Sequence, residues 1–157
     1  MTRTRNIIGI VFIGLLASIV SSCGDRELTT MEQLAKDIGI IDKYLADNNI
    51  VAQEDPSGLR YVITTEGTGP KPKLSNIIVV KYTGKLLEGT IFEAPNDPQT
   101  FPLSNLIAGW QIGFQLLPEG STAVLYIPSG LGYGKTGGGP IPPNTNLIFE
   151  VELIQVK

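Results

Sequence analysis

Val80-Lys81-Tyr82-Thr83-Gly84 is the first of four segments whose order along the chain decides the fold. The others are Leu106-Ile107-Ala108-Gly109-Trp110, Gly130-Leu131-Gly132-Tyr133-Gly134 and Leu147-Ile148-Phe149-Glu150-Val151-Glu152-Leu153. The first and the last are rich in β-branched and aromatic residues and alternate in polarity, which predicts strands. The second repeats apolar residues at helical spacing, and the third is a glycine-rich loop around one aromatic residue. Aromatic residues on strands, helix and loop together predict an apolar pocket with aromatic walls.

The same criteria extend the prediction over the whole second half of the chain. Strands are predicted at residues 59–64, 77–87, 90–93, 101–103, 123–127 and 147–156. One internal helix is predicted at residues 106–117, with Ser104 as its N-cap and with Gly109 and Gly113 allowing close backbone packing. We therefore expect an α+β fold for residues 58–157, in which a curved antiparallel sheet of about five strands wraps on one short helix.

An extra N-terminal helix is predicted at residues 30–49. Thr29 or Thr30 can cap it, with Glu32 or Gln33 three residues later, as in a capping box. Its apolar positions share one face and are Met31, Leu34, Ile38, Ile41 and Leu45. We favour packing of this face on the domain, because one short helix is thin evidence for a coiled coil. A homodimer through this helix is the alternative.

The first residues of the chain resemble an export signal. Arg3 and Arg5 precede an apolar stretch at residues 7–20, which is short for a transmembrane helix of about 20 residues. Val20-Ser21-Ser22-Cys23 is similar to a bacterial lipobox, in which cleavage before the cysteine is followed by its lipidation. The resulting expectation is a lipoprotein signal peptide at 1–22, a lipid on Cys23 and a tether at 23–29.

This signal implies a location as well as a modification. We expect a protein of the bacterial cell envelope that is exported and then held at the membrane by its lipid, on the periplasmic side or at the outer membrane. An ordinary secretory signal with an incidental cysteine and an uncleaved membrane anchor are the alternatives.

Composition excludes several kinds of chemistry. The 157 residues include no His, which removes the commonest general base, and the single Cys cannot form an intramolecular disulfide. No metal-binding spacing occurs, so we expect neither a metal nor another cofactor. The formal net charge is −3 and Lys and Arg do not cluster, which disfavours nucleic-acid binding. The pocket is therefore expected to act by shape and hydrogen bonds.

Six short motifs resemble one known family in their order and spacing. They are Val-x-Tyr-Thr-Gly at 80–84, Gly-x-x-Phe at 89–92, Ile-x-Gly-Trp at 107–110, Gly-x-Gly-Tyr-Gly at 130–134, Ile-Pro-Pro at 141–143 and Leu-x-Phe-x-Val-Glu-Leu at 147–153. Over residues 59–156 the chain resembles the FKBP-type peptidyl-prolyl cis-trans isomerases, the macrolide-binding immunophilins, in a bacterial lipoprotein form.

The resemblance implies a role for each residue of the pocket. Trp110 would form the floor, and the walls would be Tyr82, Phe92, Phe101 and Phe149. Aliphatic contacts with the substrate would come from Leu106, Ile107 and Ile141. The Ile107 N–H and the Tyr133 hydroxyl would donate hydrogen bonds to carbonyl groups of the bound peptide. Glu93 completes the catalytic set at a position where the family usually has Asp.

The implied activity is isomerisation of X-Pro peptide bonds while exported proteins fold. Amide resonance opposes this rotation with a barrier of about 18–20 kcal/mol. The twisted amide has less charge separation than the planar one, so an apolar cavity favours the twisted state, which is what catalysis requires. The implied partners are proline-containing polypeptides and macrolide immunosuppressants.

Two other functions stay open at this point. Glu93 and Pro95 depart from the family pattern, and this departure favours an FKBP-fold chaperone or envelope-complex binding module with little or no isomerase activity. A carrier for a small apolar ligand in the same pocket is the more distant alternative.

Overall fold

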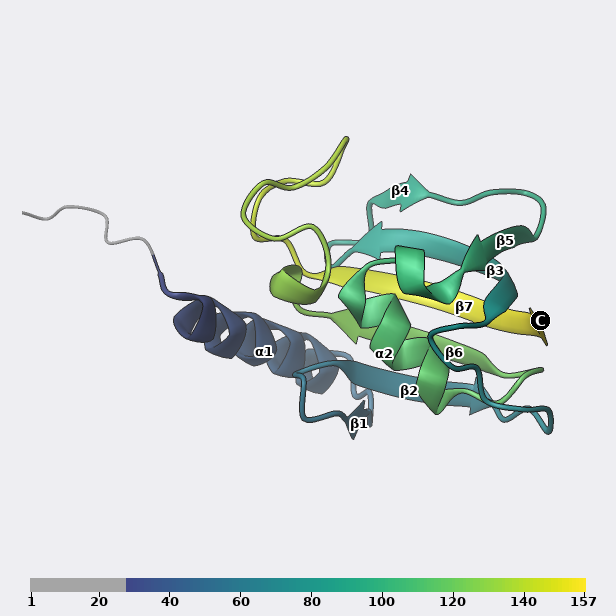
Figure 1. Cartoon of the computed structure of the whole chain (residues 1–157). Coiled ribbons are helices and arrows are strands. Elements are labelled where there is room, and N and C mark those ends of the chain that lie inside the picture. Colours follow the sequence, from purple (N-terminus) through teal and green to yellow (C-terminus); the bar gives the residue numbers. More distant parts are fainter. Residues whose placement is uncertain (1–27) are drawn as a thin grey trace, which may run out of the picture.

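The computed structural model describes residues 28–157 (Figure 1). The predicted signal peptide at 1–22 and Cys23 lie outside the described residues, as does most of the tether. Within residues 28–157, neither helix combines the length and the apolar character that crossing a bilayer requires.

The described chain forms one curved sheet with a helix on each face. The strands are β1 (Gln53–Glu54), β2 (Arg60–Thr65), β3 (Ile77–Leu86), β4 (Ile91–Glu93), β5 (Gln99–Pro102), β6 (Thr122–Ile127) and β7 (Leu147–Val156). The helices are α1 (Thr30–Asp47) and α2 (Ala108–Leu116), with 3₁₀ turns η1 (Leu103–Asn105) and η2 (Ser129–Leu131). Strands follow the spatial order β1-β2-β6-β7-β3-β4, and β5 also pairs with β3. Every pairing is antiparallel.

The predicted α+β class and antiparallel sheet are confirmed, and the sheet has more strands than expected. It contains seven strands within the described residues, where the sequence predicted about five. The difference lies in short edge elements. Strand β1 has two residues and no polarity pattern to predict it, whereas β4 and β5, which pair with opposite ends of β3, correspond to the short strands predicted at 90–93 and 101–103.

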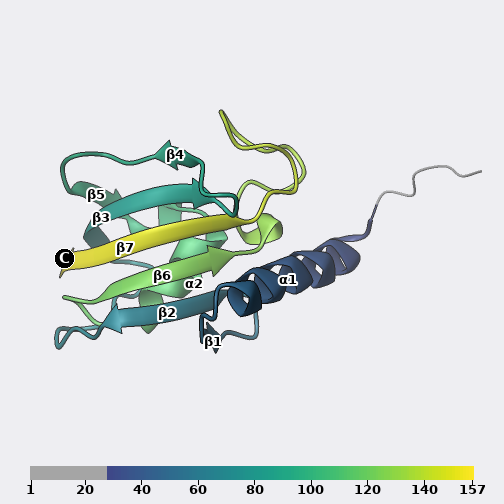
Figure 2. The same ribbon diagram turned by 180° about the vertical axis from the view of Figure 1, so that it is seen from behind.

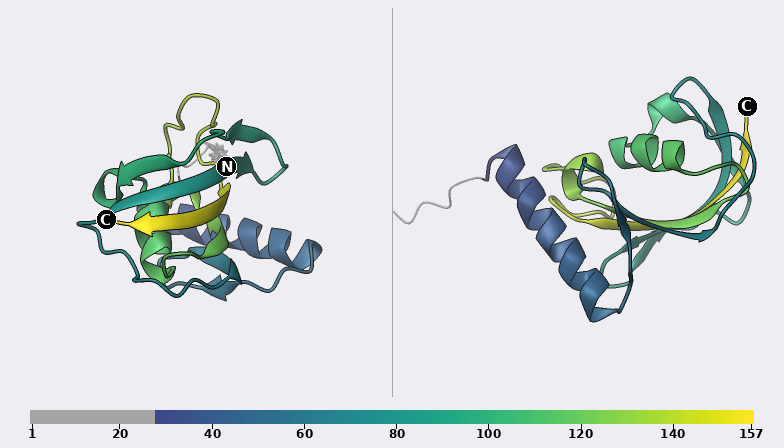
Figure 3. Two further views of the ribbon diagram at one scale, coloured as in Figure 1. Left: turned by 90° about the vertical axis from the view of Figure 1, so that its right-hand side faces the viewer. Right: turned by 90° about the horizontal axis from the view of Figure 1, so that it is seen from below.

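Helix α2 lies in the hollow of the curved sheet (Figure 3). Its Phe114 is fully buried in the core, which also contains Leu125 of β6 and Leu153 of β7. A Cβ on Gly109 would lie 2.5 Å from Ile127 Cγ2, and one on Gly113 would lie 2.8 Å from Leu125 Cδ1. The close packing predicted for these two glycines is therefore confirmed.

The start of α2 differs from the prediction. The helix begins at Ala108 rather than at 106, and Ser104 belongs to η1 instead of capping it. The reason is that Leu106 and Ile107 are extended, with ψ angles of 169° and 150°. The Gln111 Nε2 donates to the Leu106 oxygen at 2.7 Å and so satisfies a carbonyl that the helix does not use. Leu106 and Ile107 thus enter the helix from an extended approach.

Helix α1 packs on the convex face of the sheet, opposite to α2 (Figures 2 and 3). Ile41 and Leu45 are buried in a second apolar cluster with Tyr126 and Ile148. These two strand residues alternate with neighbours that face the main core, as the pleat of a strand requires. The Arg60 Nε also donates to Asp42 Oδ1 at 2.9 Å, which ties β2 to α1. Packing of α1 on the domain, the favoured interpretation, is confirmed.

The N-terminus of α1 has the predicted capping box. The Glu32 N–H donates to Thr29 Oγ1 at 3.2 Å, and the Thr29 N–H donates to Glu32 Oε2 at 2.8 Å. The predicted packing face is wrong at one position, because Met31 is 74% exposed. The buried positions of α1 are Asp37, Ile41 and Leu45, spaced by four, and Met31 lies off this row in the first turn.

Candidate active site

A cavity of ≈ 180 Å³ opens between the concave face of the sheet and the start of α2. Its lining residues are Tyr82, Glu93, Phe101, Leu106, Ile107, Trp110, Tyr133 and Phe149. They come from strands β3, β4, β5 and β7, from the extended approach to α2, from α2 itself and from the loop after η2. The structure therefore brings together eight of the residues that the sequence nominated for the site.

Aromatic rings packed edge to face form the floor and walls of the cavity. The Trp110 ring centroid lies 4.9 Å from that of Tyr82 and 5.1 Å from that of Phe149, at interplanar angles of 87° and 83°. Phe101 is 6.2 Å from Trp110 in the same type of contact. This arrangement suits the ring quadrupoles and holds each ring in place. Trp110 is 4% exposed, and its Nε1–H has no acceptor among the described residues.

Glu93 holds the phenol of Tyr82. The Tyr82 hydroxyl donates to Glu93 Oε1 at 2.7 Å, and the two residues come from the paired strands β3 and β4. Burial, followed by this hydrogen bond and the charge of Glu93, raises the pKa of Tyr82 well above its ordinary value. Tyr82 therefore stays a neutral donor at any physiological pH, and the longer Glu side chain reaches the phenol despite its departure from the family pattern.

Tyr133 is presented by a tight loop. The N–H groups of Gly132 and Gly134 both donate to the Ser129 oxygen, at 3.0 and 2.8 Å. A Cβ on Gly138 would lie 2.9 Å from Tyr133 Cδ1, so only glycine fits against this face of the ring. Burial, followed by the charge of Glu93, raises the pKa of Tyr133. The Tyr133 hydroxyl has no hydrogen-bond partner within the described chain, which leaves this neutral donor available to a ligand.

A second uncommitted donor lines the cavity at the start of α2. The Ile107 N–H makes no hydrogen bond within residues 28–157. Helices leave their first N–H groups without intrahelical acceptors, and the extended backbone of Ile107 places this one ahead of the first turn. A bound carbonyl oxygen is the natural acceptor for such a group.

Two predicted site residues lie behind the cavity rather than in its lining. The Phe92 ring packs on Phe149 at 5.5 Å and fills the space above Gly84, where a Cβ would lie 2.5 Å from its Cε2. Ile141 is buried in the core and exchanges both backbone hydrogen bonds with Gly138. Phe92 therefore supports the lining residue Phe149 from outside, and Ile141 holds the backbone of Gly138. Sequence reasoning missed the role of Gly138, for which the triple-glycine run at 137–139 was the available signal.

The donor set does not suggest a metal centre. In the described part of the chain, no three His, Cys, Asp or Glu side chains are grouped in a way that would hold a metal ion. The polar groups of the cavity are phenols, one backbone N–H and one carboxylate, which suit a peptide better than a cation.

Comparison with known proteins identifies the class to which this fold and pocket belong. Residues 69–154 match the family of FKBP-type peptidyl-prolyl cis-trans isomerases. The chain is 48% identical over 106 residues to the outer membrane protein MIP of Legionella longbeachae, covering 65% of this chain and 46% of that protein. It is 44% identical over 121 residues to the FKBP-type peptidyl-prolyl cis-trans isomerase FkpA of Aeromonas hydrophila, covering 74% and 45%. The crystal structure of FkpA from Escherichia coli has a TM-score of 0.72 at 35% identity, covering 81% of this chain and 60% of that one.

The chain belongs to the FKBP-type peptidyl-prolyl cis-trans isomerase family, a class of isomerases. The resemblance carried by the sequence motifs is thereby confirmed, and so is the fold that it implied. The chain spans less than half the length of the Legionella and Aeromonas relatives.

Proposed function

We propose that this protein is a peptidyl-prolyl cis-trans isomerase that acts on X-Pro bonds of exported polypeptides. The observation that carries the proposal is a cavity with aromatic walls and two uncommitted donors, the Ile107 N–H and the Tyr133 hydroxyl. Family membership supports the same activity. The cavity also contains the Tyr82–Glu93 pair that fixes one wall.

In this proposal the cavity works by excluding water from the bound amide. The rings of Trp110, Tyr82 and Phe149 replace solvent around the proline. A planar amide has the larger dipole and loses more hydration than the twisted amide of the transition state. The free-energy barrier to rotation therefore falls. The Ile107 N–H and the Tyr133 hydroxyl hold carbonyl groups on either side of the rotating bond, which stays free to turn. Glu93 acts through Tyr82 by orienting its ring.

One experiment separates this function from its alternatives. NMR exchange spectroscopy on an X-Pro peptide would measure isomerisation by residues 24–157, and fluorescence of Trp110, the single tryptophan, would measure binding. An isomerase accelerates exchange and changes the fluorescence. A chaperone or envelope-complex module changes the fluorescence without acceleration, and this outcome would reject the proposal. A carrier of small apolar ligands responds to the peptide in neither measurement.

We propose that the same cavity binds macrolide immunosuppressants. Such ligands offer apolar surface for the aromatic walls and carbonyl oxygens for the two donors. The expected result is that a macrolide inhibits isomerisation competitively and quenches Trp110. Inhibition that more peptide substrate does not relieve would place the macrolide elsewhere.

We propose lipid attachment at Cys23 and a location in the bacterial cell envelope. The support is the lipobox-like sequence before Cys23 and the name of the Legionella relative, which calls that protein an outer membrane protein. A chain expressed in bacteria with labelled fatty acid should carry the label, and Cys23→Ala should abolish it. Labelling that survives this substitution would reject the site.

A homodimer through α1 stays a prediction. The inner face of α1 is occupied by the sheet, so a second copy would have to use outer residues such as Met31 and Ile40, which are 74% and 43% exposed. Sedimentation of residues 24–157 should then show a dimer that Met31→Gln with Ile40→Gln converts to monomer. A monomer in the unchanged chain at high concentration would reject the dimer.

A further inference from the structure

Helix α1 contains a carboxylate that is buried without a cationic partner. Asp37 is 0% exposed, and the groups that donate to it are neutral. Its Oδ2 accepts from the Ser129 N–H at 2.9 Å and from the Ser129 hydroxyl at 2.5 Å, and its Oδ1 accepts from Gln33 Nε2 at 2.7 Å. Burying a charge is costly unless hydrogen bonds compensate for the lost water. Asp37 therefore makes directed contacts through both of its carboxylate oxygens.

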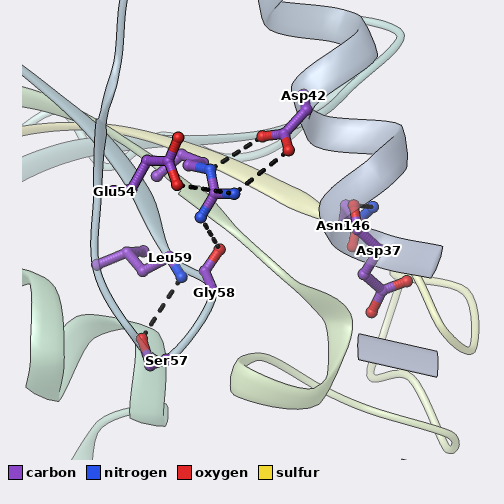
Figure 4. A network of polar contacts seen from close by, with 8 residues as sticks. Asp37, Asp42, Glu54, Ser57, Gly58, Leu59 and Asn146 are labelled. Carbon is purple, nitrogen blue, oxygen red and sulfur yellow. Dashed lines mark hydrogen bonds and ion pairs between the residues drawn. The ribbon is translucent and has the colours of Figure 1, made fainter. Parts of the chain in front are cut away.

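The network continues through Asn146, which immediately precedes β7. The Asn146 Oδ1 accepts from the Ser129 N–H at 3.0 Å, and the Asn146 Nδ2 donates to the backbone carbonyl oxygen of Asp37 at 3.2 Å. Figure 4 shows Asp37 and Asn146 close together beside α1. Ser129 is thus held by two side chains that come from segments 92 and 17 residues away.

Ser129 transmits this restraint to the pocket. Its carbonyl oxygen accepts from the N–H groups of Gly132 and Gly134, the two residues that flank Tyr133. The side chain and N–H of Ser129 therefore face Asp37, while its carbonyl fixes the loop that presents Tyr133 to the cavity. Ser129 therefore links the α1 carboxylate to this loop.

Simple anchoring of α1 does not account for Asp37. The helix is already fixed by Ile41 and Leu45 and by the ion pair of Asp42 with Arg60. Figure 4 shows the dashed lines that end on Asp42. A buried carboxylate loses its hydration, and its hydrogen bonds only offset that cost, so stability alone does not call for a carboxylate here. What a carboxylate adds is direction, because it accepts from the Ser129 hydroxyl and N–H together.

We propose that Asp37 is a positioning residue for the active site: through Ser129 it fixes the loop that carries Tyr133, and so makes α1 part of the isomerase machinery. This inference rests on the proposed function. The helix then acts as more than a spacer between a membrane anchor and the domain.

The test uses the full chain in detergent micelles, with Asp37→Ala, Asp37→Asn and the control Asp42→Ala. Asp42→Ala removes a polar anchor of the same helix but does not touch the Tyr133 loop. The loop is followed directly by hydrogen exchange of the peptide spanning residues 130–136, and catalysis by kcat/KM on an X-Pro peptide. Tyr133→Phe is combined with each Asp variant to measure their coupling.

We expect Asp37→Ala to speed exchange of residues 130–136 by at least roughly tenfold, since a charged acceptor is lost. Its kcat/KM should fall about tenfold, because a small displacement of a substrate-holding group is costly. Asp37→Asn retains one acceptor for Ser129, so its exchange rate for residues 130–136 and its kcat/KM should both lie close to the wild-type values. Asp42→Ala should change neither the exchange rate nor kcat/KM. In the Tyr133→Phe background, adding Asp37→Ala should lower kcat/KM only slightly.

Two results would overturn the positioning role. One is loop exchange in Asp37→Ala that matches Asp42→Ala, and the other is faster exchange with unchanged kcat/KM. If Asp37→Ala does not fold, Ser129→Ala, which removes the hydroxyl and keeps the backbone, must show the same two effects in smaller measure. A wild-type chain without turnover would contradict the proposed function alone, because loop exchange and peptide binding measured by Trp110 fluorescence would still decide the positioning role.

Discussion

Glu93 reaches the Tyr82 hydroxyl although its side chain is one methylene longer than the Asp that is usual in the family. The 2.7 Å hydrogen bond joins the paired strands β3 and β4, so a small shift of the longer side chain is enough to form it. From sequence, this substitution favoured weak turnover. The sequence identified both residues but could not fix the rotamer that brings them together, because that depends on strand pairing.

The first prediction concerns this pair. Glu93→Ala leaves the buried Tyr82 hydroxyl without its acceptor. The loss of a hydrogen bond to a charged group should lower the free energy of unfolding by about 1.5–3 kcal/mol. Glu93→Gln keeps an acceptor without the charge and should be affected less. Both changes should lower the raised pKa of Tyr82, as measured by ultraviolet titration of the phenols. Equal activity of Glu93→Ala and wild type would show that the pair has no role in turnover.

Gly138 provides a steric test of the Tyr133 position. In Gly138→Ala the new Cβ would lie 2.9 Å from Tyr133 Cδ1, which forces the ring to move. We expect kcat/KM to fall about tenfold with little change in Tm, since a displacement near 1 Å suffices for such losses. Gly130→Ala is the matched control, because its Cβ would meet no atom within 4 Å. Similar kinetics for the two variants would argue against a precisely placed Tyr133.

Phe92 and Ile141 show where residue-level prediction stops. Phe92 follows a turn and Ile141 precedes a Pro-Pro turn, and the family resemblance implies a place in the pocket for both. Whether such a side chain lines the cavity depends on its neighbours: Phe92 instead covers Gly84 and supports Phe149. Absence of a side chain at one strand position redirects the ring of another strand, and this is visible only once the strands are paired.

At the scale of elements, the start of α2 matters most for function. Apolar spacing predicted a helix from residue 106, because Leu106 and Ile107 continue its pattern. The structure leaves both extended, and the Ile107 N–H stays without an internal acceptor. Periodicity reports which side of an element is apolar, but it does not report backbone angles at its first residues.

Close approach of α2 to the sheet gives a stability prediction. Gly109→Ala would place a Cβ 2.5 Å from Ile127 Cγ2 in a fully packed core, which should destabilise the fold by about 1–3 kcal/mol. Gly39→Ala in α1 is the control, since its Cβ would meet nothing within 4 Å. There the helix propensity of Ala should stabilise by up to about 1 kcal/mol. Urea unfolding would measure the free energy of unfolding of both variants and of wild type. An unchanged free energy in Gly109→Ala would contradict the close packing.

At the scale of the whole molecule, the sheet separates two environments. Its concave face and α2 enclose the pocket, while its convex face holds α1 (Figure 3). The sequence predicted the pocket between the sheet and the internal helix and the packing of α1 on the domain, but not that the two helices lie on opposite faces of the sheet. It did not predict Asp37, a carboxylate in the middle of the packed face of α1, because burial of a charge depends on a partner 92 residues away.

The buried phenols make stability depend on alkaline pH. Burial raises the pKa of Tyr82 and Tyr133 above the ordinary value of 10.0. The folded state thus binds these protons more tightly, so their contribution to stability is full below pH 10.0 and is lost as pH rises through the raised pKa values. As pH rises above 10.0, Tyr82→Phe should therefore lose less stability than wild type. Tyr61→Phe, outside the pocket, is the control, and equal slopes for all three proteins would contradict this account.

The most direct test of the central claim is kcat/KM for an X-Pro peptide, measured for wild type, Tyr133→Phe and Tyr126→Phe. Tyr126 packs against α1 and lies outside the cavity, so its hydroxyl provides a matched control. We predict that wild type accelerates exchange, that Tyr133→Phe loses about tenfold in kcat/KM through one missing hydrogen bond, and that Tyr126→Phe equals wild type. A well-folded wild-type protein that leaves the uncatalysed exchange rate unchanged would contradict it.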